Sequence, residues 1–68
     1  MSASASYAVV GMTCEHCERS VQEEVAELEG VLEAHADHRT GQLTVISAAP
    51  LDPTAVAAAV DEAGYSMA

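Results

Sequence analysis

The chain has 68 residues, and eleven acidic side chains against two arginines give it a formal net charge of −9 at pH 7. A chain of this length is expected to form one domain over residues 1–68, burying only about 60% of its unfolded surface, with no room for a large substrate cleft. The acidic balance lacks the basic footprint that nucleic acids require, so nucleic acid is excluded as a partner. Anionic membrane surfaces are disfavoured for the same reason. A partner with a basic docking face would instead be attracted.

The first six residues are small and polar, and we expect residues 1–6 to be disordered or fraying. They lack the positive and apolar regions of a secretory signal, although a processed exported protein would look the same. No run reaches the length of a transmembrane helix, so no membrane insertion is expected. These features favour a cytoplasmic protein whose thiols are kept reduced.

The first half of the chain predicts a strand followed by a helix. Residues 7–10 form a short apolar run typical of a buried strand, and 11–13 form a turn. A helix should begin near Glu15 or His16 and stop at Gly30. Its apolar stripe is formed by Cys17, Val21, Val25 and Leu28, whereas Glu23, Glu24 and Glu27 face away.

The second half predicts a hairpin, a second helix and a short strand. Alternating residues indicate strands over 32–37, with Leu32, Ala34 and Ala36 facing the core, and over 42–45. Asp52 should cap the second helix, and Tyr65 to Met67 give only a short last strand. The helix should begin with Pro53, end at Gly64 and line its inner face with Val56, Ala59, Val60 and Ala63.

This order of elements predicts an α+β, ferredoxin-like βαββαβ fold. One four-stranded antiparallel sheet would pack both helices on one face. Both cysteines then lie at the first strand-to-helix corner, in the segment Gly11-Met12-Thr13-Cys14-Glu15-His16-Cys17. Exposed backbone N–H groups at such a corner favour thiolate, so at least one cysteine pKa should lie below about 8.5. The spacing alone leaves open a metal site, a redox pair or a structural disulfide.

The cysteine segment resembles the GMTCxxC loop of heavy-metal-associated (HMA) domains, and the likeness extends in element order from Tyr7 to Met67. A free-standing domain of this kind is similar to the CopZ-type bacterial copper chaperones. The resemblance implies a non-enzymatic protein that holds Cu(I) through Cys14 and Cys17. It also implies transfer by ligand exchange to the metal-binding domains of copper-transporting P-type ATPases, or to copper-sensing repressors.

The residues around the cysteines refine the expected metal. Cu(I) is soft and accepts two sulfur ligands, whereas zinc prefers four. HMA domains that serve zinc or cadmium often place Asp before the first cysteine, and Thr13 stands there in this chain. Met12 is expected to anchor the loop to the core rather than bind metal. The resemblance implies that Tyr65 shields the metal.

His16 is expected to be exposed and not to coordinate metal in the monomer. A modulating or ligand role for it remains open, especially in a copper-bridged homodimer. His35 and His38 are expected to be solvated, because their spacing does not form a Cys₂His₂ zinc set with the cysteines.

Three other functions stay open at this stage. The chain could be an N-terminal metal-binding domain cut from a copper ATPase. It could be a small thiol–disulfide oxidoreductase, although no proline or aromatic residue stands in or beside the CxxC segment as in thioredoxins. It could also be a mercury-scavenging protein, which would need export.

Overall fold

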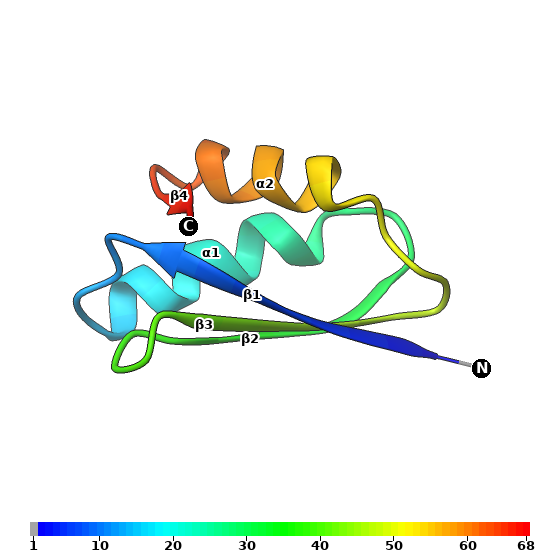
Figure 1. Ribbon diagram of the computed structural model, residues 1–68, viewed down its shortest axis with the longest axis horizontal. Coiled ribbons are helices and arrows are strands. Elements are labelled where there is room, and N and C mark those ends of the chain that lie inside the picture. The colour runs from blue at the N-terminus through cyan, green and yellow to red at the C-terminus, as the bar shows by residue number, and fades with distance from the viewer. Residues whose placement is uncertain (1) are drawn as a thin grey trace.

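The computed structural model describes residues 2–68 and confirms the βαββαβ order. The strands form one antiparallel sheet in the order β2-β3-β1-β4. Both helices cover the same face of this sheet, which is the ferredoxin-like arrangement (Figure 1). The elements are β1 (Ala3–Val10), α1 (Glu15–Ala26), β2 (Val31–Asp37), β3 (Gln42–Ser47), α2 (Pro53–Glu62) and β4 (Ser66–Met67).

The first strand is longer than predicted. β1 begins at Ala3, four residues before the expected start at Tyr7. Residues 3–8 of this strand pair with β3, from Ala3 opposite Ser47 to Ala8 opposite Gln42. The prediction that residues 1–6 are disordered or fraying is therefore not met at residues 3–6, because pairing with β3 holds them. Met1 lies outside the described residues.

The core consists of small and medium apolar side chains between the sheet and the two helices. Leu43, Val21, Val25, Val56 and Val60 have no solvent exposure at all. On α1 the half-buried Cys17 packs against this core, and on α2 the buried Ala59 belongs to it. α1 ends at Ala26, four residues before the expected stop at Gly30, so Leu28 packs against the core from the turn that follows the helix. Ala63 packs there from the C-cap of α2. The predicted inner faces are confirmed for the residues that lie within the helices. Within residues 2–68, no helix combines the length and apolarity needed to cross a membrane.

The second strand departs from the predicted alternation at its start. The register of β2 against β3 shifts between Val31 and Glu33, which marks a β-bulge or irregularity at Leu32. An extra residue in a strand changes the face on which the following side chains lie. Leu32 is accordingly 61% exposed, while Val31 packs against the core in its place. The expectation that Leu32 faces the core is wrong for this reason.

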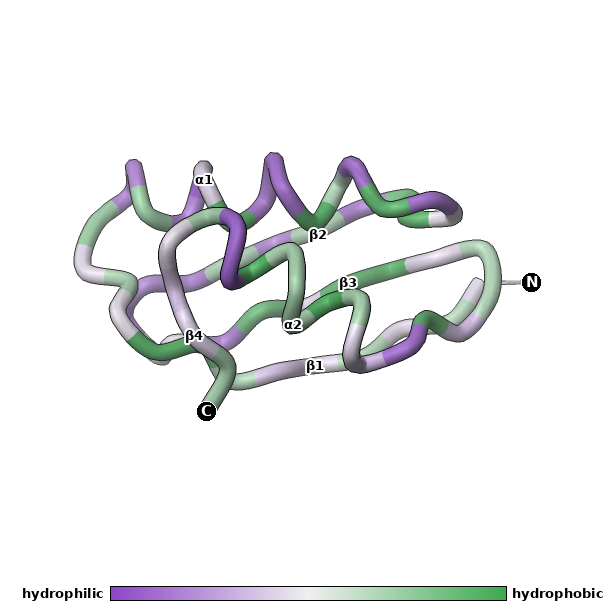
Figure 2. The backbone as a smooth tube through the Cα atoms, turned by 90° about the horizontal axis from the view of Figure 1, so that it is seen from above, coloured by the Kyte–Doolittle hydropathy of each residue, from purple (hydrophilic) through white to green (hydrophobic). Residues whose placement is uncertain are grey.

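The outer face of α1 is strongly acidic, and one of its carboxylates turns partly inward. Hydrophilic residues follow this helix along its length (Figure 2). Glu24, expected to face away, is half-buried. Its partial burial and then the neighbouring Glu27 carboxylate raise the pKa of Glu24 above its usual value. The protonated form of Glu24 is thus favoured on folding, so its contribution to stability falls as the pH rises.

The second helix begins as the sequence predicts. Asp52 precedes Pro53 and accepts a hydrogen bond on Oδ1 from the Thr54 N–H at 2.9 Å.

The β2–β3 turn ends at a glycine that lies against β1: the Val9 N–H donates to the Gly41 carbonyl at 2.7 Å. Gly41 has a φ of +76°, and a Cβ there would lie 2.9 Å from the Val9 carbonyl oxygen. Only glycine meets both demands.

We predict that Gly41→Ala destabilises the metal-free protein more than Gly30→Ala does. Both glycines have positive φ, but a Cβ on Gly30 would meet nothing within 4 Å. The backbone conformation alone costs about 1–2 kcal/mol for a non-glycine residue, and the clash at Gly41 should bring its loss to about 3 kcal/mol. Urea unfolding measures both values, and equal losses would contradict the steric argument.

Candidate metal centre

The cysteine loop joins β1 to α1 at the end of the molecule that also carries the β2–β3 turn and β4 (Figure 1). Two contacts fix this loop. The Met12 side chain is only 7% exposed and belongs to the core cluster, where a residue that anchors the loop is expected to lie. Gly11 has a φ of +102°, and a Cβ there would lie 3.3 Å from the Tyr65 ring. Met12 therefore anchors the loop in the core, and the Tyr65 ring lies close beside Gly11.

Cys14 occupies the N-cap position of α1 but does not use its side chain as a cap. Its backbone is extended, with φ −158° and ψ 176°, and no side-chain cap hydrogen bond forms. The Cys14 carbonyl instead accepts from the N–H groups of Cys17 and Glu18, at 3.1 and 3.3 Å. A thiol at the N-cap thus leaves its sulfur exposed and free for other chemistry.

Cys17 lies in the first turn of α1, half-buried, and the structure brings its sulfur next to that of Cys14. The two Sγ atoms are 3.5 Å apart, and both cysteines are free. The separation is far longer than the roughly 2.05 Å of a disulfide bond. Both sulfurs can therefore reach one soft metal ion placed between them at the surface.

The surroundings of Cys17 favour its ionised form. A backbone hydrogen bond from Thr13, then the Tyr65 hydroxyl and the Thr13 hydroxyl, lower the pKa of Cys17 to about 6. Partial burial opposes this shift, and the Cys14 thiol adds a small lowering effect. The Thr13 Oγ1 lies 3.7 Å from the Cys17 sulfur. Cys17 is consequently mostly thiolate at pH 7 before any metal arrives.

The Tyr65 hydroxyl donates a hydrogen bond to the Cys17 sulfur. Its hydrogen bond to Cys17, followed by partial burial and by the charge of the thiolates, raises the pKa of Tyr65 above its usual value. The phenol therefore stays protonated and acts as a donor to sulfur. Its half-buried ring packs against the core. Tyr65 closes one side of the cysteine pair.

The structure separates His16 from this arrangement. His16 is exposed on the first turn of α1, between the two cysteines in sequence. Among the described residues, no hydrogen bond joins its ring to either sulfur. Arg19 is also exposed. The expectation that His16 lies at the surface is confirmed, and its role toward metal stays a prediction.

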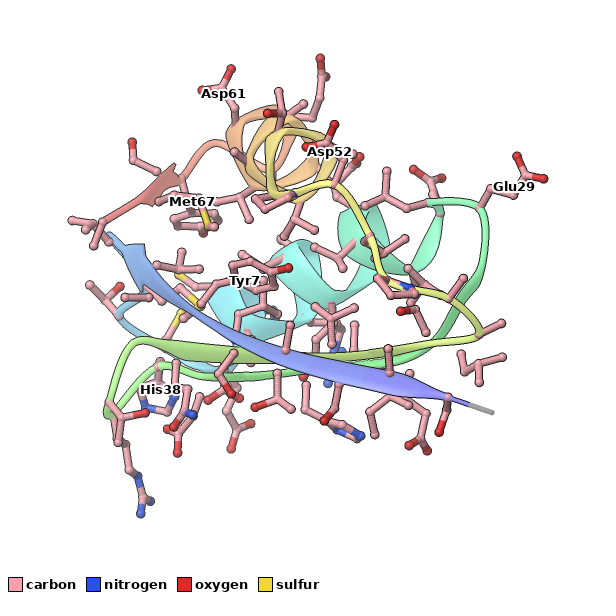
Figure 3. All side chains as sticks on the ribbon, turned by 45° about the vertical axis from the view of Figure 1, so that its right-hand side comes forward. Tyr7, Glu29, His38, Asp52, Asp61 and Met67 are labelled. Carbon is pink, nitrogen blue, oxygen red and sulfur yellow. The ribbon has the colours of Figure 1, made fainter. Side chains whose placement is uncertain are left out.

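His38 is not the solvated residue that the sequence predicts. The Glu18 Oε2 accepts hydrogen bonds from both the backbone N–H and the Nδ1 of His38, each at 2.7 Å. The two side chains are 26% and 22% exposed, and the bonds from His38 hold the pKa of Glu18 below its usual value. This pair ties the β2–β3 turn (His38 in Figure 3) to the residue that follows Cys17.

Ligand atoms of Glu18, Asp37 and His38 lie within 4.8 Å of one another, but two hydrogen bonds already engage the Glu18 carboxylate. His35 lies apart, exposed, with its Nε2 3.9 Å from Glu33. No Cys₂His₂ set forms among the described residues. The sequence gives no signal for the Glu18–His38 contact, since twenty positions separate the two residues.

Thr13 is the site residue whose role the sequence analysis missed. We expected it only as a marker of the metal type. Its amide and its hydroxyl both act on Cys17. The four-residue spacing between Thr13 and Cys17 at a helix start is the signal that could have predicted this contact.

Residues 6–66 match the model of the heavy-metal-associated domain, and the chain belongs to this family, a class of metal-binding domains that are not enzymes. It is 34% identical over 61 residues to the copper chaperone CopZ of Bacillus subtilis, with 88% of each chain covered. It is 37% identical over 59 residues to the COP-associated protein of Helicobacter felis, covering 87% of this chain and 89% of that protein. A solved CopZ metallochaperone superposes with a TM-score of 0.87 at 24% identity, covering 97% and 100% of the two chains.

We predict that Tyr65→Phe raises the pKa of Cys17 from about 6, because the thiolate loses its phenol donor. Thiolate absorbance followed against pH in metal-free protein measures this change. A thiol whose pKa is lower in the folded than in the unfolded protein stabilises the fold at pH values above the unfolded pKa, and this contribution is lost as the pH falls through about 6. Because Tyr65→Phe raises the folded pKa toward the unfolded one, the variant should also be less stable at neutral pH.

Tyr7→Phe is the matched control for this measurement, because Tyr7 is a half-buried tyrosine that does not act on Cys17. An unchanged titration in Tyr65→Phe, or an equal shift in Tyr7→Phe, would show that the phenol does not hold the thiolate.

Proposed function

We propose that this chain is a cytoplasmic copper chaperone that binds Cu(I) between Cys14 and Cys17. The observation that carries the proposal is the pair of free sulfurs 3.5 Å apart at an exposed corner, with the pKa of Cys17 lowered to about 6. Thiolate is the form that binds soft metals, and here one of the two ligands is ionised in advance. Metal binding then displaces few protons at neutral pH.

Several features support copper rather than zinc. Cu(I) is satisfied by few soft sulfur ligands, whereas a structural zinc site needs four. The described residues bring only two sulfurs together, and no histidine or carboxylate joins them. Thr13 stands where zinc-serving domains often have Asp. The relative from Bacillus subtilis reported above is a copper chaperone, which agrees with this choice.

The exposed position of Cys14 supports transfer by ligand exchange. With metal–thiolate bonds of about 2.3 Å, linear binding would place the two sulfurs about 4.6 Å apart, so they must separate by roughly 1 Å. Cys14 can supply this movement, because its side chain is exposed and makes no cap bond. An acceptor thiolate then forms a third bond to copper, after which a bond to one of the chaperone sulfurs breaks. Each new bond precedes the loss of an old one, so free copper is never released.

The acceptor that fits best is a metal-binding domain of a copper-transporting P-type ATPase, with a copper-sensing repressor as a further acceptor. The net charge of −9 favours an acceptor with a basic face around its own cysteines. Opposite charges would speed the encounter, and the ligand exchange would complete it.

We predict that the metal-free, reduced protein binds one Cu(I) per chain, and that Cys14→Ser/Cys17→Ser abolishes this binding. Titration under anaerobic conditions against a Cu(I) chelator measures stoichiometry and affinity. His16→Ala is the control and should bind as the parent does, because its ring is exposed and bonds neither sulfur. Parent-like affinity in the double serine variant would refute the proposal.

We also predict that copper moves only on contact. Copper-loaded protein should load a dithiol acceptor domain rapidly when the two are mixed, and far more slowly across a dialysis membrane. Insulin reduction measured on the same samples tests the oxidoreductase alternative. Equal transfer rates with and without contact would contradict ligand exchange, and efficient insulin reduction would favour redox chemistry.

A further inference from the structure

The outer edge of β1 is only partly covered. β4 pairs with the C-terminal end of this strand, with Met67 opposite Val9 and Ser66 opposite Val10. The remaining part of β1, residues 3–7, pairs with β3 along its inner edge. Within residues 2–68 no strand pairs with the outer edge of this segment. The N-terminal end of β1 lies at the end of the molecule opposite to the β1–α1 loop (Figure 1). We call residues 3–7 along this edge the open edge of β1.

Two hydrogen bonds show which backbone groups point outward. The Val9 N–H donates to the Gly41 carbonyl, on the β3 side, and the Ala8 carbonyl accepts from the Ala68 N–H, on the β4 side. Backbone groups of successive residues in a strand point to opposite edges. Even-numbered residues of β1 therefore present their N–H and C=O groups outward.

On the open edge these outward groups belong to Ser4 and Ser6. Both residues are exposed, and their outer N–H and C=O groups have no strand partner among the described residues. Ala5 lies midway between them with its backbone groups turned to β3. The outward backbone groups of the open edge are thus arranged symmetrically about Ala5.

The open edge carries no charge in a chain that is otherwise strongly acidic. The first charged residue is Glu15, although the net charge is −9. Proteins usually protect such an edge with charged residues or proline, and neither occurs here. The acidic residues lie on the helices, in the segments next to their ends and on β2, which forms the opposite edge of the sheet. Two copies can therefore meet at this edge without carboxylates facing one another.

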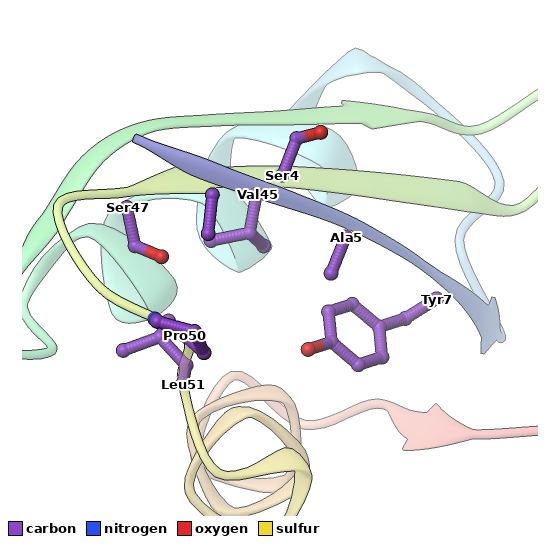
Figure 4. Close-up of a pocket in the computed structure, with 8 residues that line it drawn as sticks. Ser4, Ala5, Tyr7, Val45, Ser47, Pro50 and Leu51 are labelled. Carbon is purple, nitrogen blue, oxygen red and sulfur yellow. The ribbon is translucent and has the colours of Figure 1, made fainter. Parts of the chain in front are cut away.

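A shallow groove adjoins the open edge on the helix-bearing face (Figure 4). Ala3, Ala5 and Tyr7 line it from β1, and Pro50 and Leu51 line it from the segment before α2. The two alanines leave space beside the tyrosine ring. A large apolar side chain brought in by a neighbouring strand can fill this space.

We propose that two copies of this chain pair antiparallel along the open edge, about a two-fold axis at Ala5. Ser4 of each copy then lies opposite Ser6 of the other, and each pair exchanges two backbone hydrogen bonds, which makes four in all. Ala3 lies opposite Tyr7 of the second copy, so each tyrosine meets a small residue beside the groove. The two sheets become one continuous sheet, with the interface isologous as a two-fold axis requires.

The dimer is weak and leaves the cysteines free. A five-residue strand pair buries far less than the roughly 1,200 Å² of a stable interface, so association requires a high protein concentration. Cys14 and Cys17 belong to the loop and the first turn of α1 that follow the other end of β1. This dimer forms without metal and is distinct from a copper-bridged one.

Sedimentation equilibrium of the metal-free protein, with chelator and reductant present, tests the proposal with two matched variants. Ser4→Glu/Ser6→Glu places like charges opposite each other at both pairs and should weaken dimerisation about tenfold or more. Ser4→Lys/Ser6→Glu places opposite charges there and should restore or strengthen it. Ser20→Glu/Ala58→Glu adds the same charge at exposed helix positions and should leave the dimer unchanged.

A parent protein that stays monomeric at about 1 mM would overturn the proposal, given the weak interface expected. Equal dimerisation in both Ser4/Ser6 variants would also overturn it. A second readout uses a Cys14→Ser/Cys17→Ser background. Ala5→Cys should form an intermolecular disulfide on oxidation, because directly opposite residues of this kind are about 4.5 Å apart, whereas Ala8→Cys should not.

Discussion

The site depends on one constraint: residues that neighbour each other in the loop are held in opposite environments. Met12 is buried in the core, and two residues later Cys14 is exposed. The buried thioether fixes the start of the loop, so the helix that follows begins at a defined place. The exposed Cys14 side chain can move without displacing the loop, because the buried Met12 holds the loop in place. Firm placement and access to a partner thus come from the same short segment.

The second contribution is electrostatic. Thiolate is held at Cys17 by the amide and hydroxyl of Thr13 and by the phenol of Tyr65. These groups are dipoles, so they stabilise the anion without neutralising it and without competing for a metal. A lysine or arginine in their place would form an ion pair that metal would have to break. No carboxylate of the acidic surface is among the groups that shift the pKa of Cys17.

The limits of sequence reasoning appear at particular residues. Periodicity predicted the apolar stripe of α1, but it failed at Leu32, where a bulge shifts the strand by one residue. The small polar start of the chain suggested fraying, yet residues 3–6 pair with β3. His38 looked solvated because its partner Glu18 lies twenty positions away. In each case the deciding contact joins segments that are distant in sequence, and no local pattern records it.

The sequence by itself determined the order of elements, the inner faces of the helices, the capping of α2 by Asp52 and the position of both cysteines. These features follow from local propensity and periodicity, which act over a few residues. Only the tertiary structure decided that Tyr65 adds to the effect of Thr13 in lowering the pKa of Cys17, because Tyr65 reaches the sulfur from the other end of the chain. It also decided that part of β1 lies open at the edge of the sheet, since strand order depends on how distant segments pack and not on the residues of the strand alone.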